Sequence, residues 1–97
     1  MTLTYHRLVQ RDVSEIVRRY DDAGGDQLGD AFFSELTARL AHIRDSPTRF
    51  HRWKGDLRRA NLVRFRYHVL FRIAGERVRV LVVRHNRRDP AFGLDRQ

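Results

Sequence analysis

Histidine and arginine side chains gather just after the most hydrophobic stretch of the sequence. Residues 83–90 read VRHNRRDP, so that His85 is followed by Arg87 and Arg88 before Pro90 ends the segment. Histidine can exchange a proton near neutral pH, and arginine can hold a phosphate through two parallel hydrogen bonds. These residue types indicate a surface that meets an anionic partner. They also permit metal-free RNA cleavage, which needs a base, an acid and cations beside the phosphate.

The charge of the chain is concentrated in its second half. The formal net charge is +8, but residues 1–46 hold 6 arginines and 8 acidic residues, a net of −2. Residues 47–97 hold 14 basic and 4 acidic residues, a net of +10, and Lys54 is the only lysine. A preference for arginine codons would explain the excess of arginine but not this asymmetry. The second half is therefore expected to attract nucleic acid, phosphate or an acidic protein segment.

Length and composition exclude several classes of protein. Ninety-seven residues predict a single domain over 1–97. The absence of cysteine excludes disulfides and thiolate chemistry. The N-terminus lacks the apolar core of a signal peptide and no apolar run is long enough to span a bilayer, so a cytoplasmic protein without membrane contact is expected. The histidines lack the short spacings of metal ligands, so no metal or cofactor is expected.

Two consecutive helices are predicted in the first half of the chain. The first is predicted to begin at Asp12, which with Glu15 forms an acidic variant of a capping box, and to end at Gly24-Gly25. The second is predicted from Asp26, as a possible cap, to Asp45, because Ser46-Pro47 follows. The apolar residues of both helices recur at helical spacing.

Strands are predicted on both sides of this helical region. They cover residues 3–9, 58–63, 67–73 and 77–85, and the last two form a hairpin through a turn at 74–76. Residues 48–57 are predicted to be a loop that Phe50 and Trp53 anchor to the core. The order of elements predicts an α+β fold of βααβββ type, a small antiparallel sheet with both helices packed on one face.

The alternation of side chains predicts two different faces for the hairpin. Pairing Ile73 with Val78 buries one apolar face under the helices. The opposite, helix-free face then carries Arg66, His68, Leu70, Arg72, Arg79, Leu81, Val83, His85 and Arg87. In this register His68 lies opposite Val83, and the two histidines are diagonal neighbours in a basic groove. Single arginines on such a face are commonly only solvated, but their convergence with two histidines favours a functional surface.

The chain resembles the RelE/ParE superfamily of toxins from bacterial type II toxin–antitoxin modules, also known as plasmid stabilisation proteins. The resemblance covers nearly the whole chain and is carried by four segments in order: RDVSEIVRRY, FFSELTARLAHIRDSPTRF, RRANLVRFRYHVLFRI and VRVLVVRHNRRDP. Arg66 departs from the many relatives that have proline before the tyrosine.

The resemblance implies a toxin that inhibits growth, a tightly bound cognate antitoxin, and one of two targets. ParE-like members poison DNA gyrase, whereas RelE-like members cut messenger RNA on the ribosome. The His-x-x-Arg-Asp-Pro ending is more similar to the ParE-like side. The arginine and lysine set of the cutting members is mostly missing, since His68 and Pro90 stand near two of its positions. A gyrase poison without enzymatic activity is therefore favoured.

Two alternatives stay open at this point. In a RelE-like endoribonuclease the catalytic candidates are His68, His85, Arg66 and Arg87. The other alternative is a non-toxic, basic nucleic-acid-binding module. Contacts to the target or to nucleic acid are predicted at Arg66, Arg72, Arg79, Arg87 and Arg88. Contacts to the antitoxin are predicted at Leu70, Leu81, Val83 and Arg18, with operator DNA bound only through the antitoxin.

Overall fold

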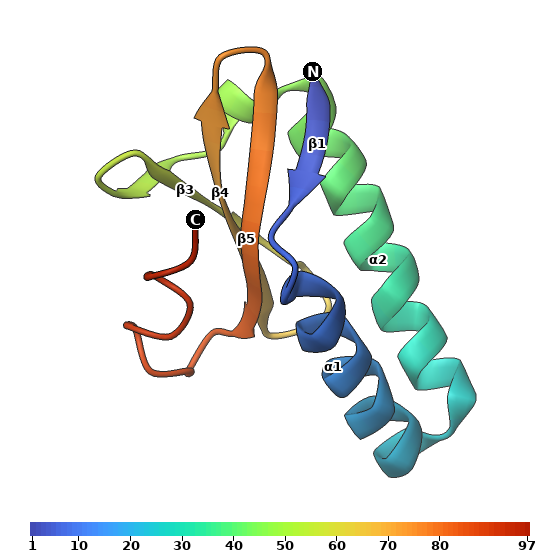
Figure 1. The fold of residues 1–97 in the computed structure, drawn as a ribbon. Helices are drawn as coiled ribbons and strands as arrows, with labels where there is room; N and C mark the ends of the chain where they lie inside the picture. The colour runs from blue at the N-terminus through green and yellow to red at the C-terminus, as the bar shows by residue number, and fades with distance from the viewer.

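Two helices cover one face of a five-stranded sheet in the computed structural model, which describes residues 1–97 (Figure 1). The elements are β1 (Thr2–Tyr5), α1 (Val9–Gly24), α2 (Asp26–Asp45), the 3-10 helix η1 (Pro47–Arg49), β2 (Arg52–Lys54), β3 (Leu57–Asn61), β4 (Tyr67–Ala74) and β5 (Arg77–His85). The strand order is β1-β5-β4-β3-β2; β1 runs parallel to β5 and the other pairs are antiparallel. The predicted α+β fold is confirmed. Neither helix has the length and apolar character needed to cross a membrane.

The first strand ends and the first helix begins earlier in the chain than the sequence predicts. β1 ends at Tyr5, because the chain turns there and the backbone N–H of Leu8 donates to Nδ1 of His6 at 3.1 Å. The helix α1 then begins at Val9. The prediction that Asp12 caps this helix is wrong, since its carboxylate lies inside the first turn and accepts hydrogen bonds from Arg96.

The core lies between the helices and the sheet. It contains an aromatic cluster in which the rings of Tyr20 and Phe32 lie 5.6 Å apart and each lies 5.0–6.0 Å from the rings of Phe65 and Tyr67. Offset and edge-on aromatic pairs stabilise a core beyond the area that they bury. The cluster joins both helices to the start of β4, and it thereby fixes the end of the sheet at which the candidate residues lie.

The predicted loop between α2 and β3 is partly regular. Arg52–Lys54 forms the short strand β2, which pairs with β3 and was missed because three residues show no alternation. Phe50 anchors this segment as predicted, with its ring 5.8 Å from that of Phe71. Trp53 is half-buried, and its ring lies 5.1 Å from the guanidinium carbon of Arg84.

A β-bulge shifts the register of the hairpin halfway along its length. Ile73 pairs with Val78 as predicted, but Phe71 pairs with Val80 while Leu70 pairs with Val82. Leu81 is thus an extra residue in β5. Such a residue moves every later side chain of the strand to the other face. The predicted pairing of His68 with Val83 is therefore wrong.

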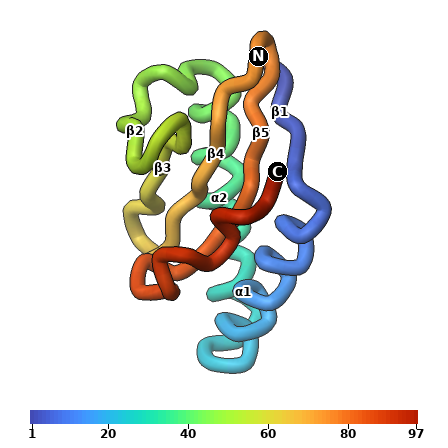
Figure 2. Tube along the Cα trace, turned by 60° about the vertical axis from the view of Figure 1, so that its left-hand side comes forward, coloured from blue at the N-terminus to red at the C-terminus, as the bar shows by residue number.

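The C-terminal segment 86–97, here called the tail, covers part of the face that the helices leave open. Figure 2 shows the tail in front of β4 and β5, with α2 behind the sheet. The tail approaches β5 closely at Gly93, where a Cβ atom would come within 2.9 Å of the Val82 side chain. Leu70 and Val82 are consequently buried, although they face away from the helices. The expected open basic groove does not exist on this part of the sheet.

Candidate functional site

The two candidate histidines lie on opposite faces of the sheet. After the bulge, His68 pairs with Arg84, and Tyr67 pairs with His85. His85 therefore shares the helix-covered face with Tyr67, and the two rings meet edge-on at 5.0 Å. His68 lies on the face covered by the tail. The histidines are not the diagonal neighbours that the sequence predicts, so they do not form one acid–base pair.

His68 is held by hydrogen bonds at both ring nitrogens. Nε–H of Arg84 donates to Nε2 of His68 at 2.9 Å, and Nδ1 lies 2.8 Å from Oδ1 of Asn86. These partners fix the neutral tautomer in which Nδ1 carries the proton and donates a hydrogen bond to Oδ1 of Asn86. The ring is 1 % exposed, and its burial, with smaller effects of the nearby arginines, lowers the pKa of His68 to about 4. No free lone pair is left for a substrate.

Arg84 ties the tail to the sheet. Its Nη1 donates to the carbonyl oxygens of Asp89, Pro90 and Phe92 at 3.2, 2.8 and 2.9 Å. Burial lowers the pKa of Arg84, and the dense set of acceptors satisfies its charge. Of the arginines in the cationic segment 84–88, this one is structural. Its role was missed because the sequence gives no sign that the carbonyls of the Asp89-Pro90 turn converge.

His85 lines a small polar cavity between α1 and the end of the sheet. The cavity has a volume of about 70 Å³, enough for about two water molecules. Glu15, Arg19 and Arg88 also line it. Nδ1 of His85 accepts a hydrogen bond from the backbone N–H of Arg87 at 3.0 Å, whereas Nε2 has no partner within the chain. His85 is thus the candidate histidine that keeps a nitrogen for proton exchange or for a partner.

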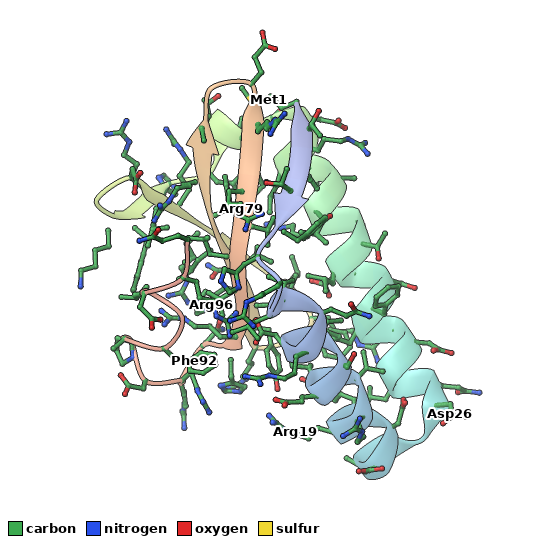
Figure 3. All side chains as sticks on the ribbon, in the orientation of Figure 1. Met1, Arg19, Asp26, Arg79, Phe92 and Arg96 are labelled. Carbon is green, nitrogen blue, oxygen red and sulfur yellow. The ribbon has the colours of Figure 1, made fainter.

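The arginines predicted to contact a target divide into two groups. Arg66, Arg87 and Arg88 are exposed at the end of the sheet beside His85, and none of them forms an ion pair. Arg72 and Arg79 pair with each other across the hairpin, nearer its turn. Arg79 donates to backbone oxygens of the two terminal segments, whereas Nε of Arg72 lies 3.8 Å from Oδ2 of Asp56 and has no hydrogen-bond partner. Figure 3 shows Arg79 on the hairpin and, lower in that view, Arg96 of the tail. The predicted single basic face is therefore two separate surfaces.

Three of the four residues predicted to contact an antitoxin are not accessible. Leu70, Leu81 and Val83 are at most 2 % exposed; Leu70 lies on the tail-covered face, and the bulge turns Val83 toward the helices. The prediction that these three residues are exposed anchors is therefore wrong. Arg18 is exposed on α1, as its position outside the apolar stripe predicts.

The accessible apolar surface lies instead between the helices and β1. A groove of about 580 Å³ is lined mainly by apolar side chains of α1, α2 and β1. Phe33 and Tyr5 stand at this groove with 54 % and 45 % of their surface exposed. Phe33 follows Phe32 directly, and the adjacency of two phenylalanines on a helix is the sequence signal that one of them faces outward.

The chain contains no cluster of three or more histidine and carboxylate side chains that could hold a metal ion. The candidate site at the end of the sheet contains His68, whose two ring nitrogens are both hydrogen-bonded, and His85, whose Nε2 is free. It also contains arginines that form no ion pair. Such a set can bind an anion and orient it, and His85 can exchange a proton with it.

Comparison with known proteins agrees with this fold. The model of the family described as ParE toxin of type II toxin–antitoxin system, parDE, matches residues 3–90. Toxin ParE2 of Mycobacterium tuberculosis, from strains CDC 1551 / Oshkosh and ATCC 25618 / H37Rv, is 31% identical over 88 residues, which are 91% of this chain and 84% of the relative. The solved structure described as the chromosomal ParDE TA system from P. aeruginosa superposes with a TM-score of 0.80 at 16% identity, covering 88% of this chain and 95% of that one. The chain belongs to the ParE family of toxins of type II toxin–antitoxin systems.

Proposed function

We propose that this toxin inhibits growth by acting on DNA gyrase rather than by cutting RNA, and that a cognate antitoxin neutralises it. Membership of the ParE family supports the choice of target. The observation that carries the proposal is the locked state of His68, whose two ring nitrogens are occupied by Arg84 and Asn86. A protein that acts by docking on another protein needs no free base at this position.

RNA cleavage through the 2′-hydroxyl would require a group that accepts a proton near neutral pH. A histidine with a pKa of about 4 is a weak base, and His68 has no lone pair free to act. The alternative of a messenger-RNA endonuclease would therefore depend on His85. One specific observation keeps that alternative in view: Nε2 of His85 is free and stands beside the unpaired cations Arg19 and Arg88. The exposed Arg66, Arg87 and Arg88 would serve as target contacts in either case.

The antitoxin is proposed to lay an amphipathic helix in the apolar groove between α1, α2 and β1. The exposed ring of Phe33 and the groove volume of about 580 Å³ suit the apolar face of such a helix. Acidic residues of the same partner would complement the half of the chain that carries a net charge of +10. Binding of operator DNA is assigned to the antitoxin, and the action of the toxin is placed in the cytoplasm.

Induction of the toxin alone, with two assays on the same cells, tests this proposal. Gyrase–DNA cleavage complexes are expected to accumulate, while messenger RNA on ribosomes stays uncut. Co-expression of the antitoxin encoded beside the toxin is expected to restore growth. Messenger RNA cut at fixed positions within codons, with cutting lost in His85→Ala, would instead establish the nuclease alternative. Normal growth on induction would favour a non-toxic binding module.

A further inference from the structure

A second polar cavity lies between the C-terminal end of α2 and strand β3, which pairs with β2 and β4. Its volume is about 500 Å³, and Phe50 is its one hydrophobic lining residue. This cavity is separate from the small cavity at His85, and none of the arginines predicted to contact a target lines it. It has no role in the proposed action on gyrase.

The cavity concentrates positive charge. Its cationic or protonatable side chains come from α2, η1, the following loop and β3, and they are Arg39, His42, Arg49, His51 and Arg59. The one carboxylate at the rim, Asp45, is hydrogen-bonded to Arg44 at 3.0 Å. None of the three lining arginines forms an ion pair within the chain. Three guanidinium charges are therefore left for an anion from outside.

A single asparagine orients two of these guanidiniums. Nε of Arg39 donates to the backbone oxygen of Asn61 at 2.9 Å, and Nε of Arg59 donates to its side-chain oxygen at 2.7 Å. Arg39 also stacks over the ring of Phe50, at 5.4 Å from its centroid. Fixing a guanidinium through Nε leaves its terminal nitrogens available, and both Nη groups of Arg39 are unbonded within the chain. Nη2 of Arg59 also makes a long hydrogen bond of 3.4 Å to Oδ1 of Asn86.

We propose that this cavity binds the phosphate of a nucleotide. A planar guanidinium can pair with two phosphate oxygens at once, and the terminal phosphate of a nucleotide carries more charge than the carboxylate of a peptide. The volume far exceeds that of a phosphate ion and falls within the range of cavities for small organic ligands. A free nucleotide and a single strand of nucleic acid both offer this group, and the test below separates them.

Titration of the purified full-length protein at physiological salt tests the proposal, with three probes. The probes are a nucleoside diphosphate, a labelled single-stranded octanucleotide and an acidic octapeptide. Binding of the diphosphate alone would identify a free nucleotide as the ligand. Stronger binding of the octanucleotide would identify a nucleic-acid strand. Equal or stronger binding of the peptide, or binding of none of the three at millimolar concentration, would overturn the proposal.

Substitutions locate the binding. The double variant Arg39→Gln/Arg59→Gln is expected to weaken nucleotide binding by about tenfold or more, since it removes two charged hydrogen-bond donors. Arg49→Gln changes a side chain with no hydrogen bond in the chain, so it keeps the fold intact and is expected to weaken binding by about threefold.

Asn61→Ala preserves the charge and is also expected to weaken binding, because Arg59 loses its orientation. Arg11→Gln/Arg18→Gln removes equal charge from α1 outside the cavity; an equal loss of affinity in this control would overturn the proposal.

Discussion

Arg96 and Asp12, 84 residues apart, form a buried ion pair that closes the tail onto the first turn of α1. Nη1 of Arg96 lies 2.6 Å from Oδ2 of Asp12 and Nη2 lies 3.0 Å from Oδ1, with both side chains 6 % exposed. The same Nη1 donates to the backbone oxygen of Leu81, the extra residue of the bulge. The pair thus joins the tail, α1 and β5 at one point, and Figure 3 shows Arg96 there.

Replacing Arg96 and replacing Asp12 are expected to lower the free energy of unfolding by different amounts. Arg96→Ala leaves Asp12 buried within a helix that cannot move away, and we expect the free energy of unfolding to fall by about 3 kcal/mol. Asp12→Ala is expected to cost less, because the tail can release Arg96 into water. Urea unfolding of both variants measures the difference. Arg44→Ala, which breaks an exposed ion pair with Asp45, is the control and should change stability little. Equal losses in the two variants of the buried pair would contradict this account of the tail.

The neutral state of His68 predicts that stability falls in mild acid. Its pKa is lowered to about 4 in the folded protein, against about 6.5 in an unfolded chain. The unfolded state therefore binds more protons between these values, so the contribution is fully present above pH 6.5 and is lost as the pH falls toward 4. We expect a loss of about 2 kcal/mol after allowing for solvent screening.

Urea unfolding at pH 7 and pH 4.5 checks this pH dependence. His6, whose pKa is also lowered by burial, adds a smaller loss of the same sign. His68→Gln removes the titrating group and is expected to show a distinctly smaller change between the two pH values than the unaltered protein. An identical change in both proteins would mean that His68 does not titrate in this way.

His85 separates the two candidate modes of action. If the toxin acts by docking on gyrase, His85→Gln keeps a polar group near the end of β5 and should retain growth inhibition within about threefold, a change of well under 1.4 kcal/mol. If it cuts RNA, the same change removes the remaining proton acceptor and should abolish toxicity. The number of colonies on inducing medium, with equal protein levels confirmed, measures the difference.

The exposed arginines at the end of the sheet are expected to matter for toxicity. Arg87→Gln/Arg88→Gln removes two cations that have no ion-pair partner in the chain, so it should weaken target binding by about tenfold with little loss of stability. Arg7→Gln/Arg11→Gln removes equal charge near the start of α1 and should leave toxicity unchanged. Growth curves at graded inducer concentrations compare the two. Equal effects would indicate that only the net charge matters.

The apolar groove makes a separate prediction about neutralisation. Phe33→Asp places a charge where the antitoxin helix is proposed to pack, and it should raise the dissociation constant of the complex by about 100-fold. Ser34→Asp adds the same charge on the next residue of α2, outside the groove lining, and should change affinity little. Calorimetric titration with the purified antitoxin measures both. Full neutralisation of Phe33→Asp would place the antitoxin elsewhere.

The predictable and unpredictable parts of this fold have distinct physical causes. The limits of α2 follow from local signals, since Gly25 precedes the helix and Ser46-Pro47 ends it. The hairpin pairing of Ile73 with Val78 follows from alternation and from the turn at Gly75. Alternation fails at the bulge because residues 80–83, Val-Leu-Val-Val, are all apolar and give no sign of the extra residue.

The candidate site was predicted less well because it depends on contacts between distant segments. The sequence identifies His68 and His85 as candidate site residues, but it does not show that the bulge places them on opposite faces of the sheet. The tail contains few apolar residues. The local sequence therefore gives no sign that the tail packs on the sheet or that Arg96 is buried against Asp12. The accessible groove at Phe33 arises only when two helices and β1 come together.

The most direct test of the central claim uses purified toxin, DNA gyrase and supercoiled plasmid. We predict that the toxin increases the cleaved form of the plasmid trapped on gyrase, that His85→Gln does so equally well, and that added antitoxin abolishes the effect. Unchanged cleavage by gyrase, together with codon-phased cutting of messenger RNA on purified ribosomes that His85→Gln abolishes, would contradict the claim.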